Sequence, residues 1–200
     1  IRDRRMTVRK MHAIPSDAVV CLFLGRMNAD KGVQDLLAAY ASIAGAYPKL
    51  WLLLVGPDEE AMLPGLLSRL PDGIADRVVV EGYTETPERY LSAADFLCLP
   101  SYRDGFVVVV IEAAAAGLPA IGSRIYGVRD ALVDEVTGLF FHPGDVPALS
   151  AAIERLAGDP ELRHRMGGAG RLRIQREFTQ EAVVANYVGF FKGLFDGEVF

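Results

Sequence analysis

Two carboxylates, Asp104 and Glu112, lie in a mostly apolar stretch of the chain, residues 100–123. Between Gly105 and Gly122 the one ionisable residue is Glu112, and Asp104 stands eight positions before it. Burying a lone carboxylate costs free energy unless another group pairs with it or donates a hydrogen bond to it. We therefore expect Glu112 to bind a ligand, as the acceptor for two ribose hydroxyls, with a core ion pair as the alternative. For Asp104 the alternative is an N-cap of the helix that follows.

A cationic pair, Arg26 and Lys31, lies in the polar loop 25–32. A guanidinium fork and an ammonium point charge together suit a diphosphate, and two solvated loop cations are the alternative. A helix that starts after Gly105 adds free backbone N–H groups and a positive dipole end. Standard phosphate motifs are absent, because no G-x-G-x-x-G follows a strand and 117–124 has P-loop glycine spacing without the lysine. The histidines and cysteines have no metal-ligand spacing.

Composition limits the classes of function. The chain is 51% hydrophobic and 24% charged with a net charge of -5, which argues against non-specific nucleic-acid binding. Basic residues that cluster near the start and between 163 and 176 are expected on solvated helix faces. Cys21 and Cys98 lie in apolar runs and indicate buried thiols in a reducing compartment. No run is long enough to span a membrane and no secretory signal is visible, so we expect a cytoplasmic location.

Strands and helices alternate along the chain and must position these groups. Apolar runs predict strands at 18–24, 50–55, 77–81, 96–99, 119–122 and 138–141. Helices are predicted at 33–47, 59–70, 88–94, 106–116, 126–133, 147–157, 160–178 and 179–195. The alternation predicts an α/β fold with a doubly wound, mostly parallel, six-stranded Rossmann-like sheet and helices on both faces. Ligands bind such sheets beyond the carboxyl ends of the strands. We therefore expect five loops to converge there: 25–31, 56–58, 82–84, 101–106 and 123–127.

Three ordered motifs carry a resemblance to a known family. They are G-R-x-x-x-x-K-G, P-S-Y-R-D-G-F…E-A-A-A-A-G-L-P and T-G-L-F-F-H-P-G-D. They resemble the C-terminal, donor-binding domain of family 4 glycosyltransferases, which are retaining enzymes of the GT-B fold. The resemblance covers about residues 19–187. It implies transfer of a hexose-type sugar from a nucleotide-diphosphate sugar to an acceptor hydroxyl, with no cofactor and no metal. Bacterial surface polysaccharide or glycolipid synthesis is the expected setting.

The resemblance assigns roles to individual residues. Arg26 and Lys31 would hold the donor diphosphate, Asp104 would face the transferred sugar, and these three form the catalytic group. Glu112, the second acid of the E-x7-E motif, would bind the ribose hydroxyls. The other donor-binding positions are Gly25, Gly82, Tyr83, Thr84, Gly105, Phe106 and Val107. Two positions depart from the family, because the first acid is usually Glu and Val107 stands where Gly is usual. Either departure predicts altered donor choice, and the two together predict weakened activity.

The domain organisation follows from the same resemblance. Residues 1–16 would be a lead-in from an absent N-terminal domain and 17–178 the nucleotide-sugar-binding domain. Residues 179–200 would be a helix lying back towards the absent domain, with packing of its aromatic side chains against this domain as the alternative. We expect the isolated chain to be inactive, since the other domain supplies most contacts to a glycan or lipid-linked acceptor. The intact protein would associate peripherally with the cytoplasmic face of the membrane and would bind no nucleic acid. Alternatives are a sugar-nucleotide epimerase, a glycan phosphorylase with Lys31 as its candidate pyridoxal-phosphate lysine, or a non-catalytic sugar-nucleotide-binding or scaffold module.

Overall fold

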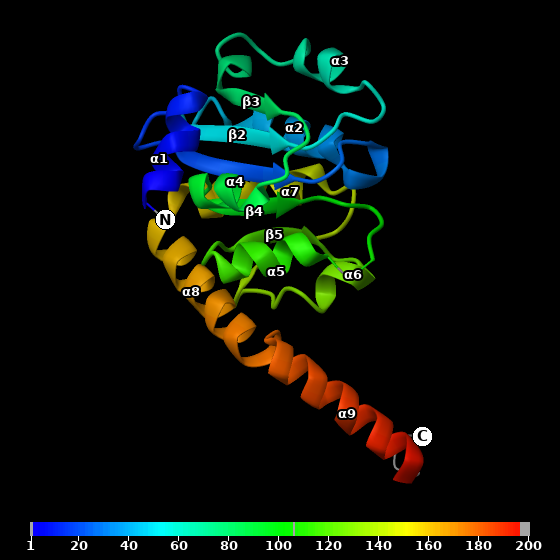
Figure 1. The fold of residues 1–200 in the computed structure, drawn as a ribbon. Helices are drawn as coiled ribbons and strands as arrows, with labels where there is room; N and C mark the ends of the chain where they lie inside the picture. The colour runs from blue at the N-terminus through cyan, green and yellow to red at the C-terminus, as the bar shows by residue number, and fades with distance from the viewer. Residues whose placement is uncertain (1, 106, 197–200) are drawn as a thin grey trace.

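Six short apolar segments form one sheet in the computed structural model, which describes residues 2–105 and 107–196 (Figure 1). The strands are β1 (Val19–Leu24), β2 (Leu50–Val55), β3 (Val78–Glu81), β4 (Phe96–Leu99), β5 (Ala120–Ser123) and β6 (Gly138–Phe141). Their order across the sheet is β3-β2-β1-β4-β5-β6, and every neighbouring pair is parallel. The strand order reverses between β1 and β4, which makes this the switch point where such sheets bind ligands. The predicted fold class is confirmed.

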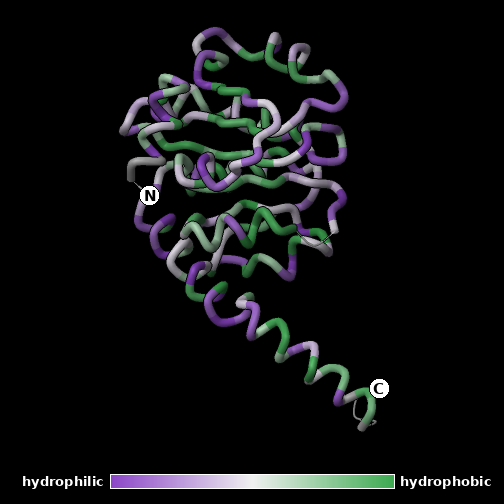
Figure 2. The backbone as a smooth tube through the Cα atoms, viewed as in Figure 1, coloured by the Kyte–Doolittle hydropathy of each residue, from purple (hydrophilic) through white to green (hydrophobic). Residues whose placement is uncertain are grey.

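Helices cover both faces of the sheet. They are α1 (Arg2–Met11), α2 (Val33–Ile43), α3 (Leu63–Leu67), α4 (Pro87–Ala93), α5 (Val108–Ala115), α6 (Tyr126–Arg129), α7 (Val146–Gly158), α8 (Pro160–Glu177) and α9 (Gln180–Asp196), with 3-10 turns η1 (Ala29–Lys31) and η2 (Ala75–Arg77). In Figure 1, α4 and α5 lie in front of the sheet and α2 and α7 behind it. Of the strands between these layers, all but the edge strand β3 are mostly buried, and they appear green in Figure 2. Burial on both faces explains why they read as continuous apolar runs in the sequence.

Three predicted helices are shorter in the structure by four residues or more. The helix expected over 59–70 is only Leu63–Leu67, because the Asp58 carboxylate accepts hydrogen bonds from the backbone N–H groups of Met62 and Leu63 (3.0 Å each) and holds a turn there. The helix expected over 126–133 ends at Arg129, since the backbone of Val133 bonds to Thr137 in the following turn. The helix expected over 33–47 ends at Ile43, ahead of Gly45. Local hydrogen bonds and a glycine thus decide where these helices begin and end.

The basic lead-in is a helix anchored by buried charge. Arg9 of α1 is only 1% exposed, and its guanidinium donates to Asp95 Oδ2 (2.8 Å) and to the Ala93 carbonyl (3.0 Å). Asp95 also accepts from Arg5 Nη2 and from the backbone N–H of Val20 (2.7 Å each). One carboxylate therefore joins α1 to the amino-terminal ends of β1 and β4. The expected solvated helix face is wrong for these two arginines.

The second basic cluster also differs from a solvated face at two positions. Arg163 Nη1 donates to the Ala157 carbonyl (3.1 Å), and burial lowers the pKa of its guanidinium. Arg173 Nη1 donates to the Ala131 carbonyl (3.0 Å). These arginines hold α8 against the last turn of α7 and the turn after α6. The free carbonyl groups at the end of a helix favour a cation.

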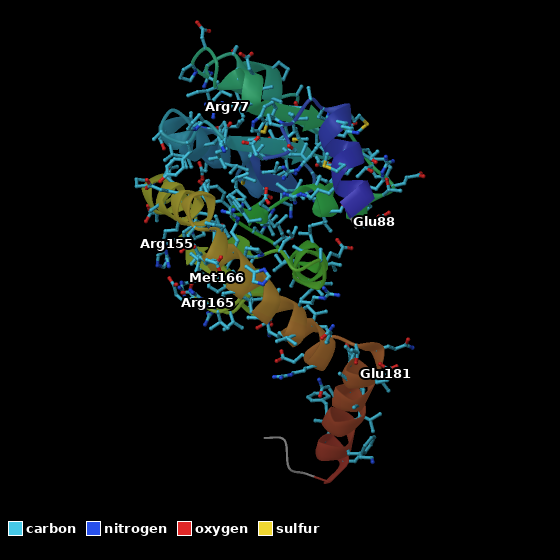
Figure 3. The ribbon with its side chains drawn as sticks, turned by 90° about the vertical axis from the view of Figure 1, so that its left-hand side faces the viewer. Arg77, Glu88, Arg155, Arg165, Met166 and Glu181 are labelled. Atoms are coloured by element: carbon cyan, nitrogen blue, oxygen red, sulfur yellow. The ribbon has the colours of Figure 1, made fainter. Side chains whose placement is uncertain are left out.

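Helix α9 extends away from the sheet and its covering helices (Figure 1). Glu181 marks its first turn in Figure 3, and the side chains beyond it project into open space. Its exposed large apolar residues are Val183, Val184, Tyr187, Val188, Phe190, Phe191, Leu194 and Phe195. Exposed apolar side chains gathered on one helix are typical of a surface that contacts another protein segment or a membrane. Its return towards an N-terminal domain stays a prediction.

Asp95→Ala should lower the free energy of unfolding by about 3–5 kcal/mol, because removing one partner leaves the Arg9 charge buried and unpaired. Urea denaturation followed by circular dichroism measures this. The control is Asp17→Asn, which breaks the ion pair with Lys49 (2.8 Å) at positions that are 64% and 68% exposed. We expect no measurable change in the control. Equal stability of both variants would contradict an anchoring role for Asp95.

Candidate functional site

A pocket of ≈ 350 Å³ opens at the carboxyl ends of β1, β2 and β3. It is lined by Leu24, Gly25, Arg26, Val55, Gly56, Pro57, Tyr83, Thr84, Pro87, Val109 and Glu112. Five of these were predicted from the sequence: Gly25, Arg26, Tyr83, Thr84 and Glu112. Tyr83 is 75% exposed, so its ring is free to stack on a flat ligand. The other predicted positions that the structure describes do not line this pocket: Lys31, Gly82, Asp104, Gly105 and Val107.

Two glycines let the loops at this edge approach closely. Gly56 has a φ of +137°, and a Cβ there would lie 2.0 Å from the carbonyl oxygen of Gly25. Gly32 has a φ of +66°, and a Cβ there would lie 2.2 Å from the carbonyl oxygen of Pro100. Glycine alone fits either position. The loop after β1 is therefore held directly against the loops that follow β2 and β4.

Lys31 and Asp104 form an ion pair across the switch point. Lys31 Nζ lies 2.6 Å from Asp104 Oδ2, and the two side chains are only 15% and 18% exposed. The backbone N–H of Tyr102 donates to the Asp30 carbonyl (2.8 Å), which ties the same two loops together. The sequence placed the acid and the cation on facing loops but did not predict that they pair. In this structure the charge of Lys31 is neutralised by the protein itself.

Arg26 is held by an acid that the sequence analysis did not identify. Its Nη1 atom lies 3.1 Å from Glu59 Oε2, and the two side chains are 62% and 37% exposed. Asn28 Nδ2 donates to the same carboxylate oxygen (3.1 Å), and Glu60 Oε2 accepts from the backbone N–H of Ala29 (3.0 Å). The available signal was the run P-D-E-E, which follows β2 after Gly56 at the expected ligand edge.

Helix α5 begins two residues later than predicted, at Val108. Its N-cap is Val107, which makes no side-chain capping bond, so the first N–H groups of α5 stay available to an anion. The N-cap alternative for Asp104 is therefore wrong. The Val107 side chain is 4% exposed and packs into the core. Phe106 lies outside the described residues.

The loop that carries Asp104 is supported by the turn after β5. A Cβ at Gly127 would lie 1.7 Å from the carbonyl oxygen of Gly105 and 2.7 Å from that of Asp104. Loop 123–127 thus packs against the loop after β4 without room for a side chain. The five loops predicted to converge do lie together at one edge of the sheet.

Glu112 is not the buried carboxylate that its apolar neighbours in the sequence suggested. It lies on the exposed side of α5 and lines both this pocket and an adjoining pocket of ≈ 500 Å³ between α4 and α5. Partial burial, and then the charge of Glu88, raise the pKa of its carboxyl group. Figure 3 labels Glu88 on α4. Within residues 2–105 and 107–196, the Glu112 carboxylate has no hydrogen-bond or ion-pair partner, so the alternative of a core ion pair is wrong.

Two further properties concern the described residues only. No group of three or more His, Cys, Asp and Glu side chains among them is arranged to hold a metal ion. No helix in this part of the chain has the length and apolar character needed to cross a membrane.

A family model described as "Glycosyl transferases group 1" matches residues 5–173. The lipopolysaccharide core biosynthesis glycosyltransferase LpsD of Rhizobium meliloti (strain 1021) is 33% identical over 179 residues, which cover 88% of this chain and 50% of LpsD. The capsular polysaccharide biosynthesis glycosyltransferase CapM of Staphylococcus aureus is 28% identical over 188 residues, covering 90% of this chain and 48% of CapM. The chain spans about half the length of the curated relatives it matches.

The chain also superimposes on solved structures. Sucrose-phosphate synthase from Thermosynechococcus elongatus superimposes with a TM-score of 0.82 at 33% identity, over 98% of this chain and 49% of that one. Anabaena HepE in complex with UDP superimposes with a TM-score of 0.85 at 19% identity, over 96% of this chain and 53% of that one. At the lower identity the second match concerns the fold alone.

Glu112→Gln should leave the chain at least as stable as the wild type at neutral pH. The pKa of Glu112 is raised above its ordinary value of 4.5, so the folded state binds more protons there than the unfolded state. Its contribution to stability is therefore fully present below 4.5 and is lost as pH rises through the higher pKa of the folded state, and Gln removes this decline. Thermal melts between pH 4 and pH 7, about the range in which a carboxyl group titrates, measure the effect, with Glu85→Gln as the control. A marked loss of stability in Glu112→Gln would contradict this.

Proposed function

The chain belongs to the family of glycosyl transferases group 1, and on this basis we propose that it is the donor-binding domain of a retaining, family 4 enzyme. Its substrate would be a nucleotide-diphosphate sugar. The observation that carries the proposal is the order of groups along the carboxyl edge of the sheet. A pocket at β3, β2 and β1 is followed by the cations Arg26 and Lys31 after β1, and then by Asp104 after β4. A nucleoside, a diphosphate and a sugar follow one another in the same order.

Each part of the donor has a matching group. The base would stack in the pocket beside Tyr83, with the backbone of residues 82–84 at its edge. The Glu112 carboxylate, which is exposed and has no partner among the described residues, would accept both ribose hydroxyls. The uncapped N–H groups of α5 and the side chains of Arg26 and Lys31 would hold the diphosphate. The raised pKa of Glu112 also supports this role, because residues with perturbed pKa values cluster at functional sites.

Transfer of the sugar breaks the bond between its anomeric carbon and the diphosphate, and negative charge develops on the leaving oxygen. Arg26, Lys31 and the start of α5 would stabilise that charge, so the reaction needs no metal. For this, Lys31 has to exchange its present partner. The diphosphate would replace Asp104 on the Lys31 ammonium, which frees the Asp104 carboxylate to accept hydroxyls of the sugar. A direct exchange avoids leaving either mostly buried charge unpaired.

The two departures from the family pattern have different consequences in this geometry. Val107 packs into the core, so its side chain does not crowd the donor. Asp104 is one methylene shorter than the usual Glu and lies against Lys31 rather than reaching outward. The departure at Asp104 therefore supports altered sugar choice more than the departure at Val107.

The acceptor would be bound mainly by the part of the protein outside this chain. The chain spans about half the length of its relatives, and the exposed apolar side chains of α9 would pack on that other part. The names of LpsD and CapM, with lipopolysaccharide core and capsular polysaccharide as products, support a role in surface polysaccharide or glycolipid synthesis. The isolated chain would bind the donor and transfer nothing. One alternative is a non-catalytic sugar-nucleotide-binding module, which the internal pairing of Lys31 with Asp104 favours.

Lys31→Ala in the intact protein should lower turnover on the order of 10²-fold or more, because the developing charge loses a preorganised cation. Release of nucleoside diphosphate in the presence and absence of acceptor measures it. The control is Lys49→Ala, whose ammonium pairs with Asp17 at an exposed position away from the site.

Acceptor-dependent release in the wild type, lost in Lys31→Ala and kept in the control, would support the transferase. Donor binding without any acceptor-dependent release would favour the non-catalytic module. Near-wild-type turnover in Lys31→Ala would contradict the assigned role of Lys31.

A further inference from the structure

We propose that Glu59 is a positioning residue that fixes both cations of the site, an inference that rests on the proposed function. Glu59 belongs to the loop after β2 and is partly exposed. Its carboxylate contacts the Arg26 guanidinium directly and reaches the turn that carries Lys31 through one intermediate side chain, Asn28. One acid thus connects the two residues that would hold the diphosphate.

The contact with Arg26 leaves most of its guanidinium free. Both carboxylate oxygens of Glu59 face the same nitrogen, Nη1, at 3.1 and 3.4 Å. In the described part of the chain, Nη2 and Nε of Arg26 make no hydrogen bond, so they remain available to phosphate oxygens. Glu59 therefore orients the fork without occupying the face that a diphosphate needs.

Through its contact with Asn28, Glu59 also affects the position of Lys31. Asn28 Nδ2 donates to Glu59 Oε2 (3.1 Å), while Asn28 Oδ1 accepts from the backbone N–H of Lys31 (3.2 Å). Asn28 is the N-cap of the 3-10 turn η1, whose last residue is Lys31. Because Glu59 fixes the orientation of the Asn28 amide, it also stabilises the turn from which the ammonium projects.

The backbone already brings Glu59 to this position. The backbone N–H of Glu59 donates to the Met27 carbonyl (3.1 Å), and the N–H of Met27 donates to the Pro57 carbonyl (2.8 Å). Little conformational entropy is then lost when the carboxylate engages Arg26 and Asn28. An exposed ion pair contributes little to overall stability, so the effect of Glu59 should appear in ligand affinity and loop order.

The charge of Glu59 and its positioning role predict opposite effects on diphosphate affinity when the residue is replaced. Removing a negative charge beside a diphosphate site strengthens anion binding by electrostatics alone. Losing the orientation of Arg26 and Lys31 weakens it. Glu60→Gln is the matched control, since it makes the same charge change in the same loop. Glu60 accepts one described bond, from the backbone N–H of Ala29, and the glutamine carbonyl oxygen can still accept it.

The experiment is a calorimetric titration of the chain with UDP, GDP, ADP and CDP, and with the corresponding nucleosides. We expect Glu59→Ala to weaken the binding of the preferred nucleoside diphosphate by about tenfold and Glu59→Gln to weaken it less, because a neutral acceptor remains. Affinity for the nucleoside should not change, because it lacks the diphosphate. Glu60→Gln should bind the diphosphate as well as the wild type or slightly better.

Amide hydrogen exchange of the ligand-free variants provides a readout that needs no nucleotide. Glu59→Ala should speed exchange at the Lys31 amide about fivefold or more, and Glu60→Gln should not. Unchanged exchange in Glu59→Ala, or diphosphate affinity equal to or above that of Glu60→Gln, would overturn the proposal. If the wild-type chain binds none of the nucleoside diphosphates, the proposed function fails, and the exchange result alone then decides whether Glu59 holds the loop.

Discussion

The ion pair between Lys31 and Asp104 is the contact on which the proposed site depends. The chain leaves β1 in one direction and β4 in the other, so their loops have no shared secondary structure to align them. The salt bridge, the bond from Tyr102 to Asp30 and the close approach of Gly32 to Pro100 align them instead. A mostly buried pair is costly to break by removing one partner, but another anion can replace the carboxylate. The same contact can therefore order the empty site and be exchanged when a diphosphate enters.

The charged groups at the two edges of the sheet have different roles. At the amino-terminal edge, the Asp95 carboxylate pairs with Arg5 and Arg9 and accepts a hydrogen bond from the backbone of β1. At the carboxyl edge the charges are more exposed, each cation has one acid, and Glu112 has no partner in the described residues. Charged groups whose hydrogen bonds are all made within the protein stabilise the fold. Charged groups with free hydrogen-bonding capacity are available to bind a ligand.

How much the sequence could predict depends on whether the signal is local. The strands were predicted within one residue, because strands buried on both faces are continuous apolar runs. Glu112 was misjudged because its neighbours in the sequence are apolar. In α5 the helical period places it with exposed Val108 and Ala115, while Val110, Ala113 and Ala114 face the core. The pairing of Lys31 with Asp104, 73 positions apart, and of Arg26 with Glu59 depends on loop contacts that no local pattern records.

A crystal structure of the chain with its preferred nucleoside diphosphate tests the central claim most directly. We predict that the ribose lies on Glu112, that the diphosphate lies between the start of α5 and the cations, and that Lys31 contacts a phosphate oxygen in place of Asp104. A diphosphate bound elsewhere, or bound here with the contact between Lys31 and Asp104 intact, would contradict the account.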